Sequence, residues 1–178
     1  MTSFKAHTPR EVAFVITNTL DKAGISAVLS GKGAAMIYAP DAFPETAKDL
    51  LLSFSVSKSA ESMMQFLGFS ETPTSGLYLH PDLSYPVELT IGLPAAWNTI
   101  RQNKVDLKIV KPIFCVRERM QAATIGKNAE AARQAAAIAL SQSVSTEAIR
   151  ESFLHDGDAL ALKLFEAHYN VLKRRNIR

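Results

Sequence analysis

The stretch Val28-Leu29-Ser30-Gly31-Lys32-Gly33-Ala34-Ala35 decides the fold. It ends a short apolar run, residues 25–29, which is typical of a buried strand, and it leads into residues 34–38, which favour a helix. Residues 30–33 therefore predict a tight turn between a strand and a helix. Glycines in such a turn let a backbone approach a phosphate closely, but they also serve simply to turn the chain. Both interpretations stay open at this point.

A helix is expected before this strand. Thr8 is a good N-cap, Pro9 suits the first helical position, and Glu11 completes a capping box. Gly24 marks the end of the helix. The apolar residues that share one face at helical spacing are Val12, Val15, Ile16 and Leu20.

Further strands and one helix are expected after the turn. Asp49 opens an otherwise apolar run interrupted by serines, and Pro81 with Asp82 suits a turn between two strands. The expected elements are, in order, strand 49–56, helix 59–67 ended by Gly68, strands 76–80 and 86–91, and strand 105–110.

After Pro112 the pattern becomes entirely helical. The expected helices are 115–123, 128–142, one from Ser145 to Gly157, and 158–175 with Leu160, Leu164, Ala167 and Val171 as its apolar stripe. The predicted fold class is α/β (α+β): a small mixed sheet flanked by helices, followed by a C-terminal helical bundle. We predict a core over residues 1–111 and a helical region over 112–178. Without a flexible linker at the boundary, we expect the helices to pack on the core.

Composition is that of an ordinary globular chain. Of 178 residues, 47% are hydrophobic and 21% charged. The single Cys115 excludes an internal disulfide and fits a reducing compartment. No run approaches the ~20 apolar residues of a membrane span, and the first residues lack the apolar core of a signal peptide. We expect a cytoplasmic protein with no membrane partner.

The net charge of +3 is mild, but positive charge gathers at the C-terminal end. Residues 173–178 carry four cations, Lys173, Arg174, Arg175 and Arg178, and no acid. Cations at a helix C-terminus offset the macrodipole, which favours a solvated helix end. A nucleic-acid contact is the alternative interpretation.

Three features occur in an order that resembles the nucleotidyltransferase fold. They are the strand and glycine turn at residues 28–35, the strand after Ala47-Lys48-Asp49-Leu50-Leu51-Leu52, and a later strand with one carboxylate, Pro86-Val87-Glu88-Leu89. In particular, the chain is similar to bacterial proteins of the AbiEii toxin type, in which the second motif often reads Lys-Asp-Ile-Asp. The helix Cys115-Val116-Arg117-Glu118-Arg119-Met120-Gln121-Ala122-Ala123 is similar to one that follows the catalytic domain there. The resemblance runs from about residue 12 to residue 140.

The resemblance implies a site for metal ions and a nucleotide. Nucleotidyl transfer uses two Mg²⁺ ions held by carboxylates, and residues i and i+2 of a strand share a face, which explains the family's Asp-x-Asp pair. Here Asp49 and Glu88 would be the catalytic and metal-binding residues, but Leu51 replaces the second carboxylate of the pair. The residues expected to bind the nucleotide are Ser30, Gly31, Lys32, Arg117 and Arg119.

Three functions stay open from the sequence. The first is a nucleotidyltransferase-like protein with degraded or lost catalysis that still binds a nucleotide, in a toxin–antitoxin or mobile-element context by resemblance only. The second is an active Mg²⁺-dependent nucleotidyltransferase that moves NMP from a nucleoside triphosphate to an RNA or protein acceptor. The third is a non-enzymatic interaction module whose basic C-terminal helix binds a partner. The sequence does not predict the oligomeric state.

Overall fold

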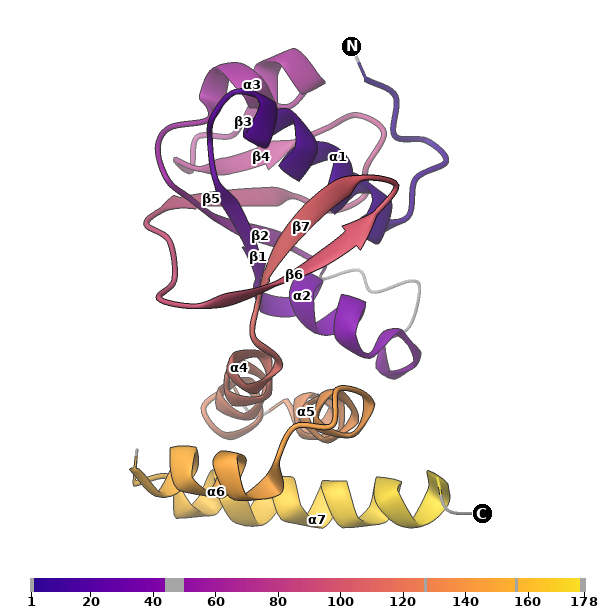
Figure 1. The fold of residues 1–178 in the computed structure, drawn as a ribbon, viewed down its shortest axis with the longest axis vertical. Helices are drawn as coiled ribbons and strands as arrows, with labels where there is room; N and C mark the ends of the chain where they lie inside the picture. The colour runs from indigo at the N-terminus through magenta and orange to yellow at the C-terminus, as the bar shows by residue number, and fades with distance from the viewer. Residues whose placement is uncertain (1, 44–49, 127, 156, 177–178) are drawn as a thin grey trace. The chain divides into compact units, whose positions relative to one another are not determined.

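The computed structural model describes the chain except residues 1, 44–49, 127, 156 and 177–178. The chain divides into two compact units. The first comprises Met1–Ala34 and Thr46–Val110, and the second comprises Ala35–Glu45 and Lys111–Arg178. The predicted α/β class is confirmed: a seven-stranded mixed sheet with N-terminal helices precedes four C-terminal helices (Figure 1).

The first helix, α1 (Pro9–Lys22), begins as the sequence predicts. The Thr8 side chain accepts from Glu11 N at 3.3 Å, and the Glu11 carboxylate accepts from Thr8 N at 2.7 Å, so the capping box is complete. Gly24, with φ of +68°, follows the end of the helix. On the apolar face of α1, the side chains of Val12, Ile16 and Leu20 are fully buried.

The sheet has the strand order β3-β4-β5-β2-β1-β7-β6. Pairs β1–β7 and β2–β5 are parallel, and the other neighbouring pairs are antiparallel. The strands are β1 (Ala27–Ser30), β2 (Leu52–Val56), β3 (Ser70–Glu71), β4 (Leu77–Leu79), β5 (Val87–Ile91), β6 (Trp97–Gln102) and β7 (Val105–Val110).

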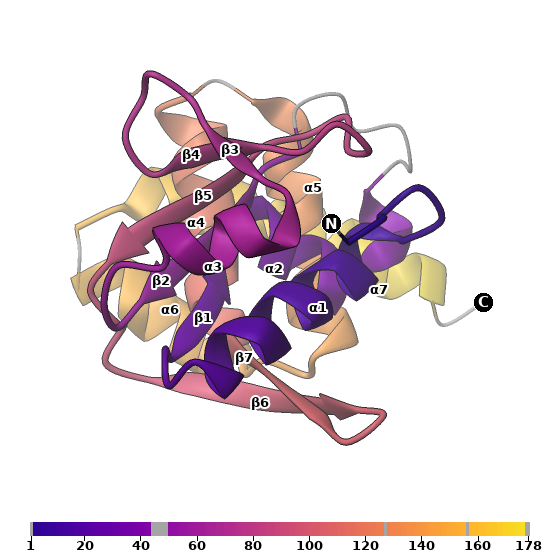
Figure 2. The same cartoon turned by 90° about the horizontal axis from the view of Figure 1, so that it is seen from above.

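Alternation along the central strands gives the sheet two different faces. In β2, Leu52, Phe54 and Val56 are buried, whereas Ser53 and Ser55 between them are half-buried. The register places the apolar residues beside Ala27 and Leu29 of β1 and Val87 of β5. Helices α1 and α3 (Glu61–Leu67) lie over one face of the sheet (Figure 2). The core of the first unit therefore lies on the apolar face, and the serine side chains mark the opposite face.

Three expectations for the first unit need correction. The helix α2 (Gly31–Tyr38) begins at Gly31 rather than after residue 33, because the glycine turn is itself the first helical turn. The strand expected over 49–56 begins at Leu52, and Asp49 lies outside the described residues. The edge strand β6 was not predicted, because its mostly exposed residues show no contrast between apolar and polar positions. It joins β7 through Asn103 and Lys104, whose φ values of 49° and 65° suit a two-residue hairpin.

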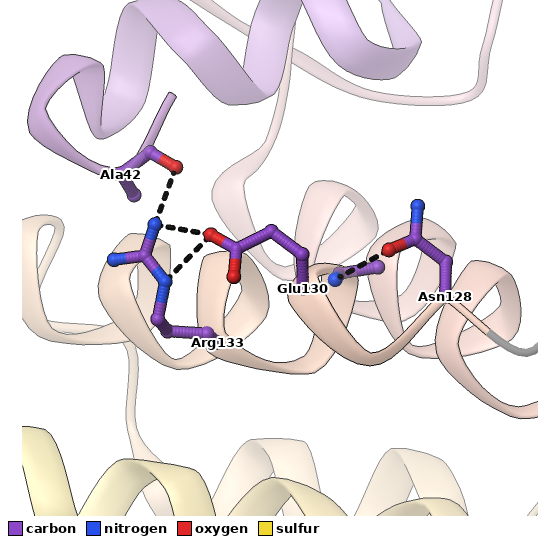
Figure 3. A network of polar contacts seen from close by, with 5 residues as sticks. Ala42, Asn128, Glu130 and Arg133 are labelled. Atoms are coloured by element: carbon purple, nitrogen blue, oxygen red, sulfur yellow. Dashed lines mark hydrogen bonds and ion pairs between the residues drawn. The ribbon is translucent and has the colours of Figure 1, made fainter. Parts of the chain in front are cut away.

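The second unit contains α4 (Pro112–Thr124), α5 (Ala129–Ser141), α6 (Thr146–His155) and α7 (Ala159–Asn176), together with the 3₁₀ turn η1 (Pro40–Ala42). The alanines of α5 are largely buried, so the neighbouring helices α4 and α7 pack closely on it. Asn128 caps α5 by accepting from Ala131 N. Arg133 pairs with Glu130 and donates to the carbonyl of Ala42 at 3.0 Å, which fastens η1 to α5 (Figure 3).

The apolar stripe predicted for the last helix is wrong. Leu160 is 71% exposed and Val171 is 49% exposed, whereas Ala161 and Phe165 are buried. α7 carries apolar residues on more than one side, so periodicity alone did not identify the packed side. None of the helices in the described part of the chain is long and apolar enough to cross a membrane.

Candidate functional site

The candidate site lies on the polar face at the centre of the sheet, where Ser30, Ser53 and Glu88 form a chain of hydrogen bonds. Ser30 of β1 and Glu88 of β5 are the register partners of Ser53 in β2. Ser30 Oγ donates to the Ser53 carbonyl at 3.3 Å, and Ser53 Oγ donates to Glu88 Oε2 at 3.0 Å. Three strands thus place a hydroxyl, a second hydroxyl and a carboxylate side by side.

The start of α2 adjoins this chain. Gly31 follows Ser30 directly and has φ of +61°, a left-handed conformation that favours glycine. A Cβ atom at Gly31 would lie 3.7 Å from Ser53 Oγ, in ordinary van der Waals contact. The first turn of α2 therefore begins beside the hydroxyl that holds Glu88.

Gly33 brings the same helical turn close to β2. A Cβ atom at this position would lie 2.7 Å from Leu52 Cδ2 and 3.5 Å from the Leu51 carbonyl. A side chain at position 33 would therefore require the Leu52 side chain to shift. The glycine at position 31 allows a left-handed backbone conformation, and the glycine at position 33 allows α2 to lie close to Leu52.

The electrostatic character of this turn suits an anion. The free N–H groups at a helix N-terminus carry partial positive charge, and they are a common binding site for phosphate. Lys32 lies in the first turn of α2, is half-buried and makes a polar contact of its own. Ser30 ends β1, and Gly31 and Lys32 belong to the first turn of α2, whereas the sequence predicts a turn at these residues and a helix from residue 34.

The described residues include no cluster of side chains that could hold a metal ion. In the described part of the chain no three His, Cys, Asp or Glu side chains gather as they would around a metal ion. Mg²⁺ needs several oxygen ligands, and a two-ion site needs bridging carboxylates. The described residues therefore do not fit a two-metal site. Asp49, the other predicted ligand, lies outside the described residues, and Mg²⁺ binding stays a prediction.

The position of the second expected carboxylate holds a leucine. Leu51 is half-buried immediately before β2, two residues ahead of Ser53, and Leu50 beside it is buried. A leucine side chain has no atom that coordinates a cation. Nothing in residues 50–56 replaces the missing carboxylate, since the polar residues of that stretch are serines.

Arg117 and Arg119 belong to α4 in the second unit, and both are half-buried. Two positions along a helix correspond to about 200° of rotation, so the two side chains leave α4 on different sides. Among the described residues, Arg119 Nε is buried without a hydrogen-bond partner. Contact of these arginines with a nucleotide at Ser30 stays a prediction.

Ser53 was not among the residues predicted from the sequence. Its signal was nevertheless present, because residues 52–57 alternate strictly between apolar side chains and serine. Such alternation identifies a strand with one polar face. The identity of the partner, Glu88, required the parallel register of β2 and β5, which no local pattern contains.

Cavities of the described part of the chain also lie away from the predicted residues. One, of about 320 Å³ in the second unit, is lined by η1 and by Arg133 and Ser141 of α5. Another, of about 470 Å³ in the first unit, has Glu61, Glu71 and Tyr78 in its wall. Burial raises the pKa of Tyr78, and Glu71 and Glu61 raise it further. Neither cavity contains a residue of the predicted site.

Comparison with known proteins gives no match: no family model, no curated protein and no solved structure matches this chain.

Proposed function

We propose that this protein is a nucleotidyltransferase-like protein that has lost transfer chemistry and binds the phosphates of a nucleotide at residues 30–32. The observation that carries the proposal is the hydrogen-bonded chain Ser30–Ser53–Glu88 beside the left-handed Gly31 at the start of α2. The topology supports it, since a strand leads through a glycine turn into a helix, and the next strand returns antiparallel beside the first.

Phosphate binding follows from the groups at the helix start. Gly31 has no side chain to keep an anion away from the backbone, and Lys32 adds a full positive charge in the same turn. Ser30 Oγ, which donates to the Ser53 carbonyl, can also turn its hydrogen to a phosphate oxygen.

Loss of transfer chemistry follows from the carboxylates. Glu88 is held by Ser53, and Leu51 supplies no ligand where the resemblance expects one. Among the described residues no three His, Cys, Asp or Glu side chains gather, and a two-metal site needs such a cluster of carboxylates. Without a bound cation, the negative charge of Glu88 repels the phosphates, so binding depends on Lys32 and on the helix N-terminus.

Calorimetric titration of the four ribonucleoside triphosphates, with and without Mg²⁺, tests the proposal. We expect at least one to bind equally well in both conditions. Lys32→Ala should weaken binding about tenfold, because it removes a charge-assisted contact. Lys58→Ala is the matched control, since Lys58 is an exposed lysine of the same unit that lies outside the site.

Glu88→Gln distinguishes binding without a metal from metal-dependent catalysis. If Glu88 merely faces the phosphates, its neutralisation should strengthen binding severalfold in the absence of Mg²⁺. If it holds a metal, the same change should weaken Mg²⁺-dependent binding, and Asp49→Ala should abolish NMP transfer to an RNA or protein acceptor. Absence of binding in both conditions would reject the proposal. It would favour the interaction module, whose exposed cations Lys173, Arg174 and Arg175 end α7.

A further inference from the structure

The strand β6 forms one margin of the sheet. In the strand order it stands last, and among the described strands it pairs with β7 alone (Figure 2). The opposite margin, β3, is two residues long, whereas β6 has six residues. The long margin presents backbone N–H and C=O groups that can pair with another strand.

The hairpin geometry identifies these backbone groups. Asn103 and Lys104 form a two-residue turn, so the closing pair Gln102 and Val105 is hydrogen-bonded. Hydrogen-bonded and non-bonded pairs alternate along an antiparallel ladder. The backbone groups of residues 98, 100 and 102 therefore point to β7, and those of residues 97, 99 and 101 point to the open side.

The edge lacks the usual features that prevent pairing. Proteins protect edge strands with proline, with lysine or with charges that cannot be matched. β6 contains neither proline nor lysine, and its single charge, Arg101, is neutralised locally. Arg101 Nε and Nη2 donate to the two carboxylate oxygens of Asp106 at 2.6 and 2.7 Å. This guanidinium is largely exposed, so its flat face remains accessible.

We propose that β6 pairs antiparallel with β6 of a second copy of this chain, about a two-fold axis at Thr99. This register uses all three outward residues, because Thr99 faces Thr99 of the second copy and Trp97 faces Arg101 of the second copy. Trp97 and Arg101 lie on the same face of the strand, since they stand four positions apart and side chains alternate with a period of two. The two hydrogen bonds to Asp106 fix the orientation of each Arg101 guanidinium, which then stacks on the Trp97 indole of the other copy. Cation–π contacts most often pair Arg with Trp.

The matched side chains argue for a second copy over an unrelated extended peptide. One strand supplies both halves of the Trp–Arg pair, at equal distances on either side of Thr99. The two-fold axis therefore makes both pairs at once and brings no like charges opposite each other. A different peptide would have to carry the same spacing to gain both contacts.

Sedimentation velocity over a range of protein concentrations tests the pairing. We expect a concentration-dependent dimer whose dissociation constant rises at least about tenfold in Thr99→Pro, because each copy loses a hydrogen-bond donor at the axis. Proline is tolerated where the N–H faces away from the ladder, so the β6–β7 hairpin should stay folded, and circular dichroism checks this. Thr99→Val keeps the N–H and should keep the dimer.

Cross-linking locates the axis. A cysteine in Thr99→Cys should couple rapidly to its copy through a short thiol-specific linker, whereas one in Ser62→Cys on α3 should not. The native Cys115 does not interfere, because it is buried and burial raises the pKa of its thiol. A monomer at every concentration would overturn the proposal. A dimer that survives Thr99→Pro, or that cross-links equally through Ser62→Cys, would also overturn it by assigning the interface to another surface.

Discussion

The two faces of the central sheet hold their side chains in different ways. On the apolar face, Leu52 and Phe54 of β2 are excluded from water by neighbouring strands and helices. On the polar face of the same strand, Ser53 is half-buried and held by a hydrogen bond to Glu88. The first face stabilises by burial, which scales with area, and the second positions groups through short directional bonds. The alternation of one strand thus gives the sheet a packed apolar face and a hydrogen-bonded polar face.

The difference between the two faces predicts that substitutions at neighbouring residues of β2 lower the free energy of unfolding by unequal amounts. The largest loss is expected on the apolar face. Phe54→Ala should lower the free energy of unfolding by about 3–5 kcal/mol, because Phe54 is fully buried and leaves a cavity. Ser55→Ala, one residue further along the strand, should change it by less than about 0.5 kcal/mol. Urea denaturation measures both. Equal losses would show that the polar face is also part of the packed core.

Substitution of the two glycines of α2 compares its contact with Leu52 on the apolar face and its contact with Ser53 on the polar face. Gly33→Ala should cost about 1–3 kcal/mol, because its Cβ would lie 2.7 Å from Leu52 Cδ2 of the apolar face. Gly31→Ala adjoins Ser53 of the polar face without a clash, so its cost of about 1–2 kcal/mol should come from the left-handed φ.

A second substitution separates these two causes. Leu52→Val shortens the side chain that Gly33→Ala would strike, so the two changes should couple by more than about 0.5 kcal/mol in a double-mutant cycle. Leu52→Val with Gly31→Ala should be additive. Additivity in both cycles would show that the clash at Gly33 is absorbed elsewhere.

The smallest effect concerns the residues before α1, where Phe4 is buried against Phe69 and His80. Hydrogen bonds from Phe4 N and Ser3 Oγ lower the pKa of Asp82. A lowered folded pKa gives stability that is present above the unfolded pKa and is lost as pH falls through the folded pKa.

Asp82→Asn should therefore destabilise the protein slightly at pH 6, and the difference from the unchanged protein should shrink below about pH 4. Urea unfolding at pH 6 and pH 3 measures this difference. A gap of the same size at both values would mean that the charge of Asp82 contributes nothing to holding residues 3 and 4.

Local patterns in the sequence predicted the elements whose causes are local. The capping box at Thr8 and Glu11 is complete, Gly68 ends α3 with φ of +95°, and the turn at Pro81 separates β4 from β5. Each of these features depends on residues within four positions of one another, so a short stretch of sequence is enough to predict it.

Features that depend on contacts with distant parts of the chain were not predicted. The edge strand β6 gains its conformation from pairing with β7, and its own residues show little alternation of polarity. A closer reading of Asn103 as a hairpin residue before the alternating run 105–110 could have found it. The packed side of α7 depends on which of its apolar residues the other helices cover, and Leu160 shows that the stripe was misjudged.

The candidate site was predicted in part. A turn from strand to helix at Ser30, Gly31 and Lys32 follows from sequence, although the helix begins at Gly31 and not at residue 34; the absence of a carboxylate at Leu51 follows as well. The contact between Ser53 and Glu88 does not, because it requires the register of two strands 35 residues apart. The prediction that Arg117 and Arg119 bind a nucleotide rests on the resemblance alone. Their positions in α4 direct the two side chains to different sides of the helix.

The parallel pairing of β1 with β7 also constrains when the sheet can form. Leu29 is the register partner of Ile109, so 80 further residues (109 − 29) must be synthesised before β1 has both of its neighbouring strands. Closing so long a loop costs conformational entropy before the contact is made, and distant pairing slows folding. During synthesis, β1 can pair with β2 before β7 exists, so the edge of β1 that β7 later covers stays unpaired. Residues up to Val110 must be synthesised before the sheet of the first unit can be complete.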